Sequence, residues 1–407
     1  MFEPQDHHLP PVICFSHLRW NFVFQRPQHL MTRCARESRR LYFFEEPVFH
    51  DGSAPRLELE MSGSVTVAVP HLPYGLDDAA IILAQRTMVD QLIRQEGIDE
   101  YLLWYYTPMA LPFSQHLSPA AIVYDCMDEL SSFKGAPTIL KEREAALLSR
   151  ADVVLTGGQS LYEAKRHQHR NIHPFPSSVD VEHFGRARRV TAEPEDQTAI
   201  GRPRLGFFGV IDERLDVDLL DGVAAARPEW QLIMLGPVVK IDPALLPNRP
   251  NIHYLGSKKY DELPAYVAGW DVALLPFARN EATRFISPTK TPEYMAAGKP
   301  IVSTSIRDVV RPYGQQGLVR IADEVRPFVE ACEAAMTEDP SARIRLADAF
   351  LRQTSWDGTW RRIRRLMDAA LSPVENRRHI AGELAVDIHT SSGVLPAPRP
   401  AMGARNV

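Results

Sequence analysis

The chain has 407 residues, of which 45% are hydrophobic and 24% are charged, and it carries a net charge of −5 at pH 7. This length predicts two domains, and the acidic balance argues against a nucleic-acid partner. The cysteines, Cys14, Cys34, Cys126 and Cys332, are scattered without metal-ligand spacing, so neither a disulfide framework nor a zinc site is expected.

The first residues lack the basic, apolar and small-residue order of a signal peptide, and the longest apolar stretch, residues 101–113, is interrupted by Pro108. We therefore expect a cytoplasmic protein, either free or in peripheral contact with the inner face of the membrane. The basic amphipathic segment 355–371 is the sequence feature that could meet a membrane surface. A helix that packs its Trp, Ile, Leu and Met side chains inward is the favoured interpretation of that segment.

Short apolar runs alternate with helical patterns in the first half of the chain. The expected strands cover residues 11–17, 40–46, 64–70, 101–107, 121–128 and 152–158, and the expected helices cover residues 26–37, 79–95 and 139–150. Continuous apolar strands separated by helices are typical of a parallel sheet covered on both faces. The polar, turn-rich segment 181–203 then predicts an interdomain linker.

The alternation restarts after this segment. The expected strands cover residues 204–210, 230–236, 251–256, 271–277, 300–304 and 318–323, and the expected helices cover residues 215–226 and 260–268 and a segment that begins near Ser287. The predicted fold class is therefore α/β, with two Rossmann-like domains facing each other across a cleft. The predicted divisions are an N-terminal acceptor domain, 1–180, a linker, 181–203, a C-terminal donor-binding domain with a terminal helix, 204–371, and a polar, Pro-rich, partly disordered tail, 372–407.

The segment SPTKTPEYMAAGKPIVST, which begins at Ser287, combines charged and helix-starting residues beyond a predicted strand. Open α/β sheets bind ligands beyond the carboxyl ends of their strands. Lys290 suits a diphosphate there, and Glu293, about one turn later, can accept two hydrogen bonds from the hydroxyls of a ribose. The sequence thus predicts a nucleoside diphosphate site. A surface ion pair between the two residues is an alternative of equal weight on spacing alone.

This segment resembles the donor-binding signature of GT-B glycosyltransferases of the group 1 type, P-x-K-x-x-E-Y-M-A-x-G-x-P-V-V. The resemblance implies that Lys290 binds the diphosphate and Glu293 binds the ribose of a nucleotide sugar, UDP- or GDP-linked. It implies no further cofactor and no obligatory metal. The other donor-site residues that it implies are Gly209, Arg214, Ser257, Pro288 and Thr289.

Two further features place the chain within this resemblance. Retaining members of the group carry an additional Glu eight residues before the ribose-binding Glu. In this chain Phe285 occupies that position. The opening W-x(4)-Q-R-P-Q-H-L, from Trp20 to Leu30, resembles a branch of bacterial polysaccharide glycosyltransferases. That branch implies a saccharide or lipid-linked acceptor, with Trp20 and Arg26 on the acceptor side.

Candidates for a general base follow the predicted strands of the first half. Asp125 ends one strand and Asp128 lies in the loop beyond it, although Asp128 serves equally well as a helix cap. His17 is a second candidate base, and Arg19 is a candidate contact for a phosphate or an acidic sugar on the acceptor side. The histidines of segment 167–173 lack carboxylate or thiol partners nearby, so a polar loop is favoured over a metal site.

The sequence therefore predicts an enzyme, a glycosyltransferase that moves a sugar from a nucleotide sugar to a polysaccharide, glycolipid or similar acceptor. A nucleotide-sugar 2-epimerase and a non-catalytic carbohydrate-binding or assembly protein of the same fold are the alternatives. A dehydrogenase would need G-x-G-x-x-G after a first strand, and neither residues 11–20 nor residues 204–213 contain it.

Overall fold

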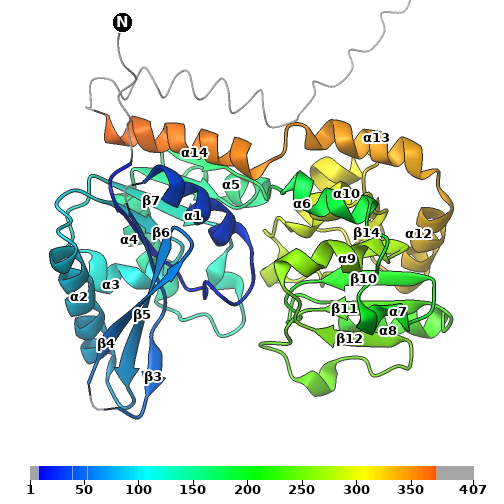
Figure 1. The fold of residues 1–407 in the computed structure, drawn as a ribbon, viewed down its shortest axis with the longest axis horizontal. Coiled ribbons are helices and arrows are strands. Elements are labelled where there is room, and N and C mark those ends of the chain that lie inside the picture. The colour runs from blue at the N-terminus through cyan, green and yellow to red at the C-terminus, as the bar shows by residue number, and fades with distance from the viewer. Residues whose placement is uncertain (1–8, 39, 53, 373–407) are drawn as a thin grey trace, which may run out of the picture.

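The protein is described from a computed structural model, which covers residues 9–38, 40–52 and 54–372. Two parallel sheets, each with helices on both faces, form two halves that lie side by side (Figure 1). Of these residues, none forms a helix with the length and hydrophobicity needed to cross a membrane. The expected tail lies almost entirely outside the described residues.

The N-terminal sheet has the strand order β3-β5-β2-β1-β6-β7-β8-β9, and β4 pairs with β5 in the antiparallel direction. Its strands are β1 (Val12–Phe15), β2 (Leu41–Phe44), β3 (Val48–His50), β4 (Arg56–Ser62), β5 (Val65–Pro73), β6 (Leu102–Tyr105), β7 (Ala121–Cys126), β8 (Val153–Thr156) and β9 (Ile172–Pro174). Its helices are α1 (Arg26–Glu37), α2 (Asp78–Gln95), α3 (Leu111–Ser114), α4 (Leu140–Arg150) and α5 (Gln159–Lys165).

Alternating side chains of each strand enter the two cores of this domain. Val12 and Cys14 of β1 pack on one face with α1, whereas Ile13 and Phe15 pack on the other face with α2 and α3. Because both faces are buried, the strand reads as a continuous apolar run, which is why the sequence predicts it well.

The C-terminal sheet has the order β12-β11-β10-β13-β14-β15, and all of its pairings are parallel. Its strands are β10 (Arg204–Phe208), β11 (Gln231–Leu235), β12 (Ile252–Gly256), β13 (Val272–Leu275), β14 (Ile301–Ser303) and β15 (Arg320–Ile321). The helices of this half of the chain are α6 (Val181–Gly185), α7 (Glu195–Thr198), α8 (Val217–Ala226), α9 (Leu263–Ala268), α10 (Lys290–Ala296), α11 (Arg307–Val309), α12 (Val325–Thr337), α13 (Pro340–Leu351) and α14 (Trp356–Leu371).

Segment 181–203 differs from the expected linker because it packs on the C-terminal domain. Phe184 of α6 is fully buried in the core of that domain. The side chain of Gln197, on α7, accepts a hydrogen bond from Trp270 Nε1 at 2.9 Å and donates one to the carbonyl of Tyr266 at 3.0 Å. A few buried side chains thus anchor a segment whose composition is otherwise polar.

The terminal helix α14 also differs from the expected division, because it crosses back to the N-terminal domain (Figure 1). Trp356, Trp360 and Ile363 are buried against β7, β8 and α1. The indole of Trp360 donates to Glu37 of α1 at 2.9 Å. The prediction that the apolar face of this helix packs inward is confirmed, and its partner is the first domain rather than the second.

The two halves also meet directly beside α5 and α11. Backbone N–H of Ser160 donates to the carboxylate of Asp308 at 3.0 Å, and Arg307 pairs with Glu163 at 2.5 Å. A Cβ atom at position 158 would lie 2.2 Å from an Asp308 oxygen, so Gly158 permits this approach. These contacts join the two halves on one side.

Candidate functional site

Lys290 lies at the first position of α10, against the loop that follows β10. Gly209 of that loop has φ 136°, and a Cβ atom there would lie 2.2 Å from Lys290 Cε and 2.5 Å from Nζ. Both the backbone conformation and the close approach therefore require glycine at this position. The ammonium faces the ring of Phe207, 5.4 Å from its centroid, and that of Phe277 at 6.0 Å. Lys290 is thus directed at the carboxyl end of β10.

Glu293 lies one turn further along α10 and is only 5% exposed. Its Oε2 has no hydrogen-bond partner among the described residues. Burial raises the pKa of this carboxyl to about 7, although Lys290 opposes the rise, and burial lowers the pKa of Lys290 to about 8. A buried acceptor without a partner beside a partly desolvated ammonium costs stability, which is typical of a ligand site.

The segment just before this pair carries Pro288 and Thr289. Thr289 is the N-cap residue of α10, and its side chain makes no capping hydrogen bond. Ser287 crosses to the N-terminal domain, where its carbonyl accepts a hydrogen bond from the hydroxyl of Ser177 at 2.5 Å. The start of α10 is therefore tied to the opposite domain.

Arg214 lies in the same loop as Gly209 and faces the N-terminal domain. Its guanidinium forms a two-pronged ion pair with Asp212, with Nη2 at 2.7 Å from Oδ2 and Nε at 3.0 Å from Oδ1. It also lies over the ring of Phe133, 5.6 Å from the centroid. Next to it, Glu213 accepts a hydrogen bond from backbone N–H of Lys134 at 2.9 Å. The loops 209–216 and 128–134 thus meet across the cleft.

Asp128 is brought into this cluster by the loop after β7. Burial raises the pKa of its carboxyl to about 6, while the positive charges of Arg214 and Arg26 lower it. The negative charge of Asp128 in turn favours the charged form of Lys290. The structure therefore brings together Asp128, Arg214, Lys290 and Glu293, which are separated by up to 165 positions in the sequence.

Asp125 and Arg26 bind each other, and their side chains do not face the cluster around Lys290. Asp125 is 0% exposed, and it accepts bonds from Arg26 Nε at 3.1 and 3.0 Å and from Nη2 at 2.9 Å. The remaining arm of the guanidinium, Nη1, donates to the carbonyl of Phe175 at 2.7 Å. Because both side chains are buried and paired, this geometry favours a structural role for them, and Asp128 is the better placed candidate base.

His17 and Arg19 follow β1, with different surroundings. His17 is half-buried and its Nδ1 has no partner among the described residues. Burial and the charge of Lys240, on a loop of the other domain, lower the pKa of His17 to about 4. The guanidinium of Arg19 donates hydrogen bonds to the carboxylate of Glu45 at 2.9 Å and to the carbonyl of Glu46 at 2.5 Å.

Trp20 and Ser257 complete the set of predicted residues. Trp20 is 8% exposed, and its indole N–H donates to Ser62 at 2.9 Å, so it anchors the β4–β5 hairpin. Ser257 is exposed in the loop that follows β12. Sequence reasoning missed Asp212 and Lys240. The spacing of Asp212 and Arg214 in one strand-end loop could have indicated Asp212, whereas the charge of Lys240 acts on His17 only through the fold.

The histidines of segment 167–173 have local partners. His169 Nε2 lies 3.0 Å from the carbonyl of Ala151, and His173 Nε2 lies 2.8 Å from the side-chain oxygen of Asn171. Within the described residues, no group of three or more His, Cys, Asp or Glu side chains is arranged to hold a metal ion. His169 and His173 thus contact neighbouring protein groups, and His173 lies in β9 rather than in a loop.

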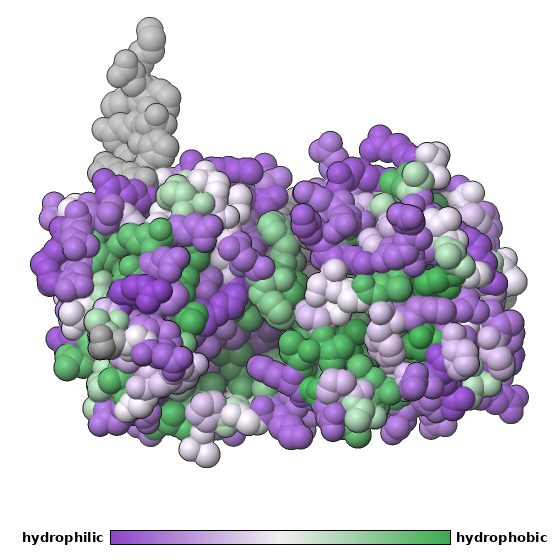
Figure 2. All heavy atoms as spheres, turned by 60° about the horizontal axis from the view of Figure 1, so that its bottom comes forward, coloured by the Kyte–Doolittle hydropathy of each residue, from purple (hydrophilic) through white to green (hydrophobic). Residues whose placement is uncertain are grey.

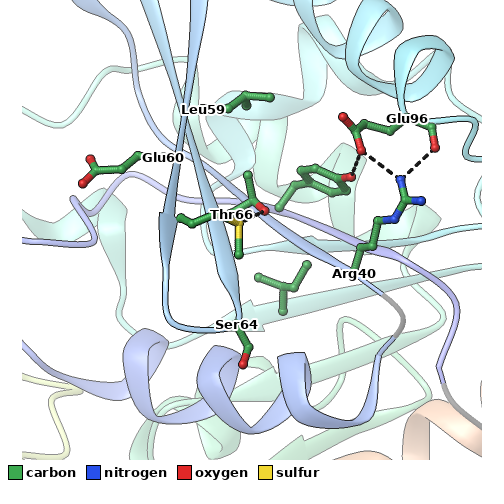
Figure 3. Close-up of a pocket in the computed structure, with 9 residues that line it drawn as sticks. Arg40, Leu59, Glu60, Ser64, Thr66 and Glu96 are labelled. Carbon is green, nitrogen blue, oxygen red and sulfur yellow. Dashed lines mark hydrogen bonds and ion pairs between the residues drawn. The ribbon is translucent and has the colours of Figure 1, made fainter.

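Figure 2 shows a hollow between the two halves, with hydrophobic surface on both of its sides. A cavity of about 490 Å³ lies at the carboxyl ends of β1 and β2. A second cavity, of about 420 Å³, lies at the amino end of β2, where Arg40 and Tyr42 both bind Glu96 (Figure 3). Because ligands of open α/β sheets bind at the carboxyl ends, we place the functional site at the first cavity and the hollow.

Comparison with known proteins relates the chain to glycosyltransferases. Residues 202–338 match the family model of group 1 glycosyl transferases. A protein of Bacillus subtilis (strain 168), TuaH, which carries the name of a teichuronic acid biosynthesis glycosyltransferase, is 25% identical over 260 residues. That match covers 58% of this chain and 64% of TuaH, slightly less than two thirds of the relative.

Solved structures with the same fold cover most of the chain. A UDP-forming trehalose-phosphate synthase from Burkholderia xenovorans is 12% identical, with a TM-score of 0.65, over 90% of this chain and 100% of that one. Sucrose-phosphate synthase from Thermosynechococcus elongatus is 13% identical, with a TM-score of 0.61, over 94% and 100%. HepE from Anabaena, solved in complex with UDP, is 13% identical, with a TM-score of 0.61, over 89% and 100%. The predicted GT-B fold is confirmed.

Proposed function

We propose that this protein, which has the GT-B fold and whose residues 202–338 form a group 1 glycosyltransferase domain, transfers a sugar from a nucleoside-diphosphate sugar to a saccharide-containing acceptor. The observation that carries the proposal is the Lys290–Glu293 pair. An ammonium beside a glycine loop suits a diphosphate, and a buried carboxylate with an unpartnered oxygen suits the hydroxyls of a ribose.

The residues across the cleft supply the remaining chemistry of the transfer. The acceptor oxygen attacks the anomeric carbon, the bond from that carbon to the diphosphate oxygen breaks, and the acceptor proton passes to Asp128. Lys290 and Arg214 lie where they neutralise the charge that develops on the departing diphosphate. Because two cationic side chains meet this need, the proposed reaction has no step that requires a metal ion.

The relatives support the choice of substrates. HepE was solved with UDP, and the trehalose-phosphate synthase is named as UDP-forming, so a UDP-linked donor is proposed ahead of a GDP-linked one. TuaH is named for the biosynthesis of teichuronic acid, which supports a polysaccharide product. We accordingly propose a cytoplasmic enzyme of polysaccharide biosynthesis that works free or in peripheral contact with the membrane.

The test is a thermal-shift panel of UDP, GDP, dTDP, CDP and NAD against the wild type and Glu293→Ala. A ligand at about 100 times its dissociation constant adds roughly 2.7 kcal/mol to the stability of the native state. We expect stabilisation by a nucleoside diphosphate, and the loss of a hydrogen bond to a charged group should weaken binding in the variant by about 1.5–3 kcal/mol. Stabilisation by NAD alone, or an unchanged affinity in Glu293→Ala, would refute the donor-site assignment.

A further inference from the structure

The cavity at the carboxyl ends of β1 and β2, which we call the N-domain cavity, has a largely apolar wall. Its volume of about 490 Å³ lies within the range of small-molecule sites. Phe15, Phe44 and Phe113 line it from the sheet and α3, and Ile81 and Ile82 line it from α2. Such a wall favours a ligand that buries hydrocarbon rather than a bare sugar.

The N-domain cavity adjoins the interdomain cleft. Ser16, the residue before His17, lines the cavity, and so does Glu46. The positive charge of Lys240, on a loop of the donor-binding domain, acts to lower the pKa of both His17 and Glu46. The cavity therefore lies on the side of the N-terminal domain that faces the loop of Lys240.

An aromatic side chain of the donor-binding domain also packs on the N-terminal domain. Phe285 packs against the N-terminal core cluster that also contains Phe15, Phe44 and Phe113. It lies in the loop between β13 and α10, three residues before Pro288. The donor-binding domain thus contributes an apolar contact to the N-terminal domain near the start of α10.

The charged groups at this cavity do not suit a phosphate. Glu45, Glu46 and Asp78 line it with negative charge, whereas Arg143 is the one basic side chain among its lining residues in the described chain. The guanidinium of Arg143 already contacts the sulfur of Met109 at 3.3 Å. The nearby Arg19 is held by Glu45 and by backbone carbonyls. A sugar phosphate therefore finds little positive charge there.

We propose that the N-domain cavity binds the hydrocarbon chain of the acceptor, so that the acceptor is a lipid-linked saccharide whose sugar lies in the cleft. The proposal rests on the proposed function, because the ligand of this cavity is an acceptor only if the protein is a glycosyltransferase. The chain would lie among Phe44, Ile82 and Phe113, and the hydroxyl that accepts the sugar would lie on the His17 and Asp128 side.

The probe is n-octyl β-D-glucopyranoside below its micelle-forming concentration, compared with methyl β-D-glucopyranoside by isothermal titration. Each buried methylene contributes roughly 0.8 kcal/mol, or about fourfold in affinity, so the octyl glycoside should bind the wild type at least tenfold more tightly. Glucose 6-phosphate, which represents a polar acceptor, should bind no more tightly than the methyl glycoside.

Ile82→Trp, which fills the cavity, should abolish the octyl preference. Leu83→Trp is the matched control, since Leu83 is the next residue of α2, is 63% exposed and does not line the cavity. Ile139→Lys is a second variant, at a lining position that is 37% exposed and so tolerates a polar side chain. A thermal unfolding midpoint close to that of the wild type verifies the fold of each variant.

Equal affinity of the octyl and methyl glycosides, or an octyl preference that survives in both cavity variants, would overturn the proposal. Tighter binding of glucose 6-phosphate would overturn it in favour of an anionic acceptor. These measurements do not involve donor binding or turnover. A failure here is therefore distinguishable from a failure of the proposed function, which the nucleotide panel detects.

Discussion

The buried pair of Arg26 and Asp125 yields a prediction that separates structural from catalytic carboxylates. In Asp125→Asn the amide keeps the shape of the side chain but loses the charge that faces Arg26 at 2.9–3.1 Å. The guanidinium then remains buried and uncompensated. Removing one partner of a buried ion pair costs about 3–5 kcal/mol of stability, and we expect a loss of this size.

The cost of removing both charges from water offsets the attraction within a buried ion pair, so we expect the pair itself to add little net stability. Replacing both partners with apolar residues of similar size should therefore recover most of the loss. Arg26→Met/Asp125→Leu is the variant to compare with Asp125→Asn in urea unfolding, where the midpoint and the slope are both measured. We expect the double variant to unfold much closer to the wild type than the single one.

Asp128→Asn is the matched variant. Asp128 lies two residues beyond the end of β7 and is half-buried. The variant should unfold within about 1 kcal/mol of the wild type but lose activity, since general base catalysis contributes roughly 10²–10⁴-fold. If instead Asp125→Asn retains full stability and loses turnover, Asp125 performs the chemistry and the assignment by pairing is refuted.

Three further predictions concern charges in the cleft and beside it. Because the pKa of Asp128 is about 6 and a base must be ionised, kcat/KM should fall as pH falls through about 6, and the residual activity of Asp128→Asn should lack this limb. Only the ammonium form of Lys290 attracts a diphosphate, so the affinity for UDP, measured by calorimetry, should fall as pH rises above about 8 in the wild type and stay level in Lys290→Gln. Lys165 lies 2.8 Å from Glu144 and 2.7 Å from Glu129, so Lys165→Met should lose about 3–5 kcal/mol in urea unfolding, whereas Lys165→Arg should lose less.

The proposed donor side could be read from the sequence because its residues are local. Lys290 and Glu293 lie in one short segment, and strands on either side of it are continuous apolar runs. The same reasoning located α1 and most strands of both sheets. It missed β4, because Leu59 and Met61 of that edge strand are exposed and alternate with charged residues, so no buried run marks the strand.

The acceptor side could not be predicted in the same way because its contacts join distant segments. Asp125 and Asp128 look alike in the sequence, and what separates them is Arg26, about 100 positions earlier. The apolar face of α14 predicts burial but not its partner, and Trp356 reaches His29 of α1, with ring centroids 4.6 Å apart. Amphipathic patterns specify a buried face, whereas the surface that covers it depends on the whole chain.

Phe285 connects the two sides of the site. At the position where retaining relatives by resemblance carry a Glu, this chain carries a phenyl ring that packs on the N-terminal core cluster and lies 5.2 Å from the guanidinium of Arg284. A contact between the two halves thus stands where the resemblance implies a carboxylate beside the donor sugar. The anionic group that we propose to act on the acceptor, Asp128, comes from the opposite domain.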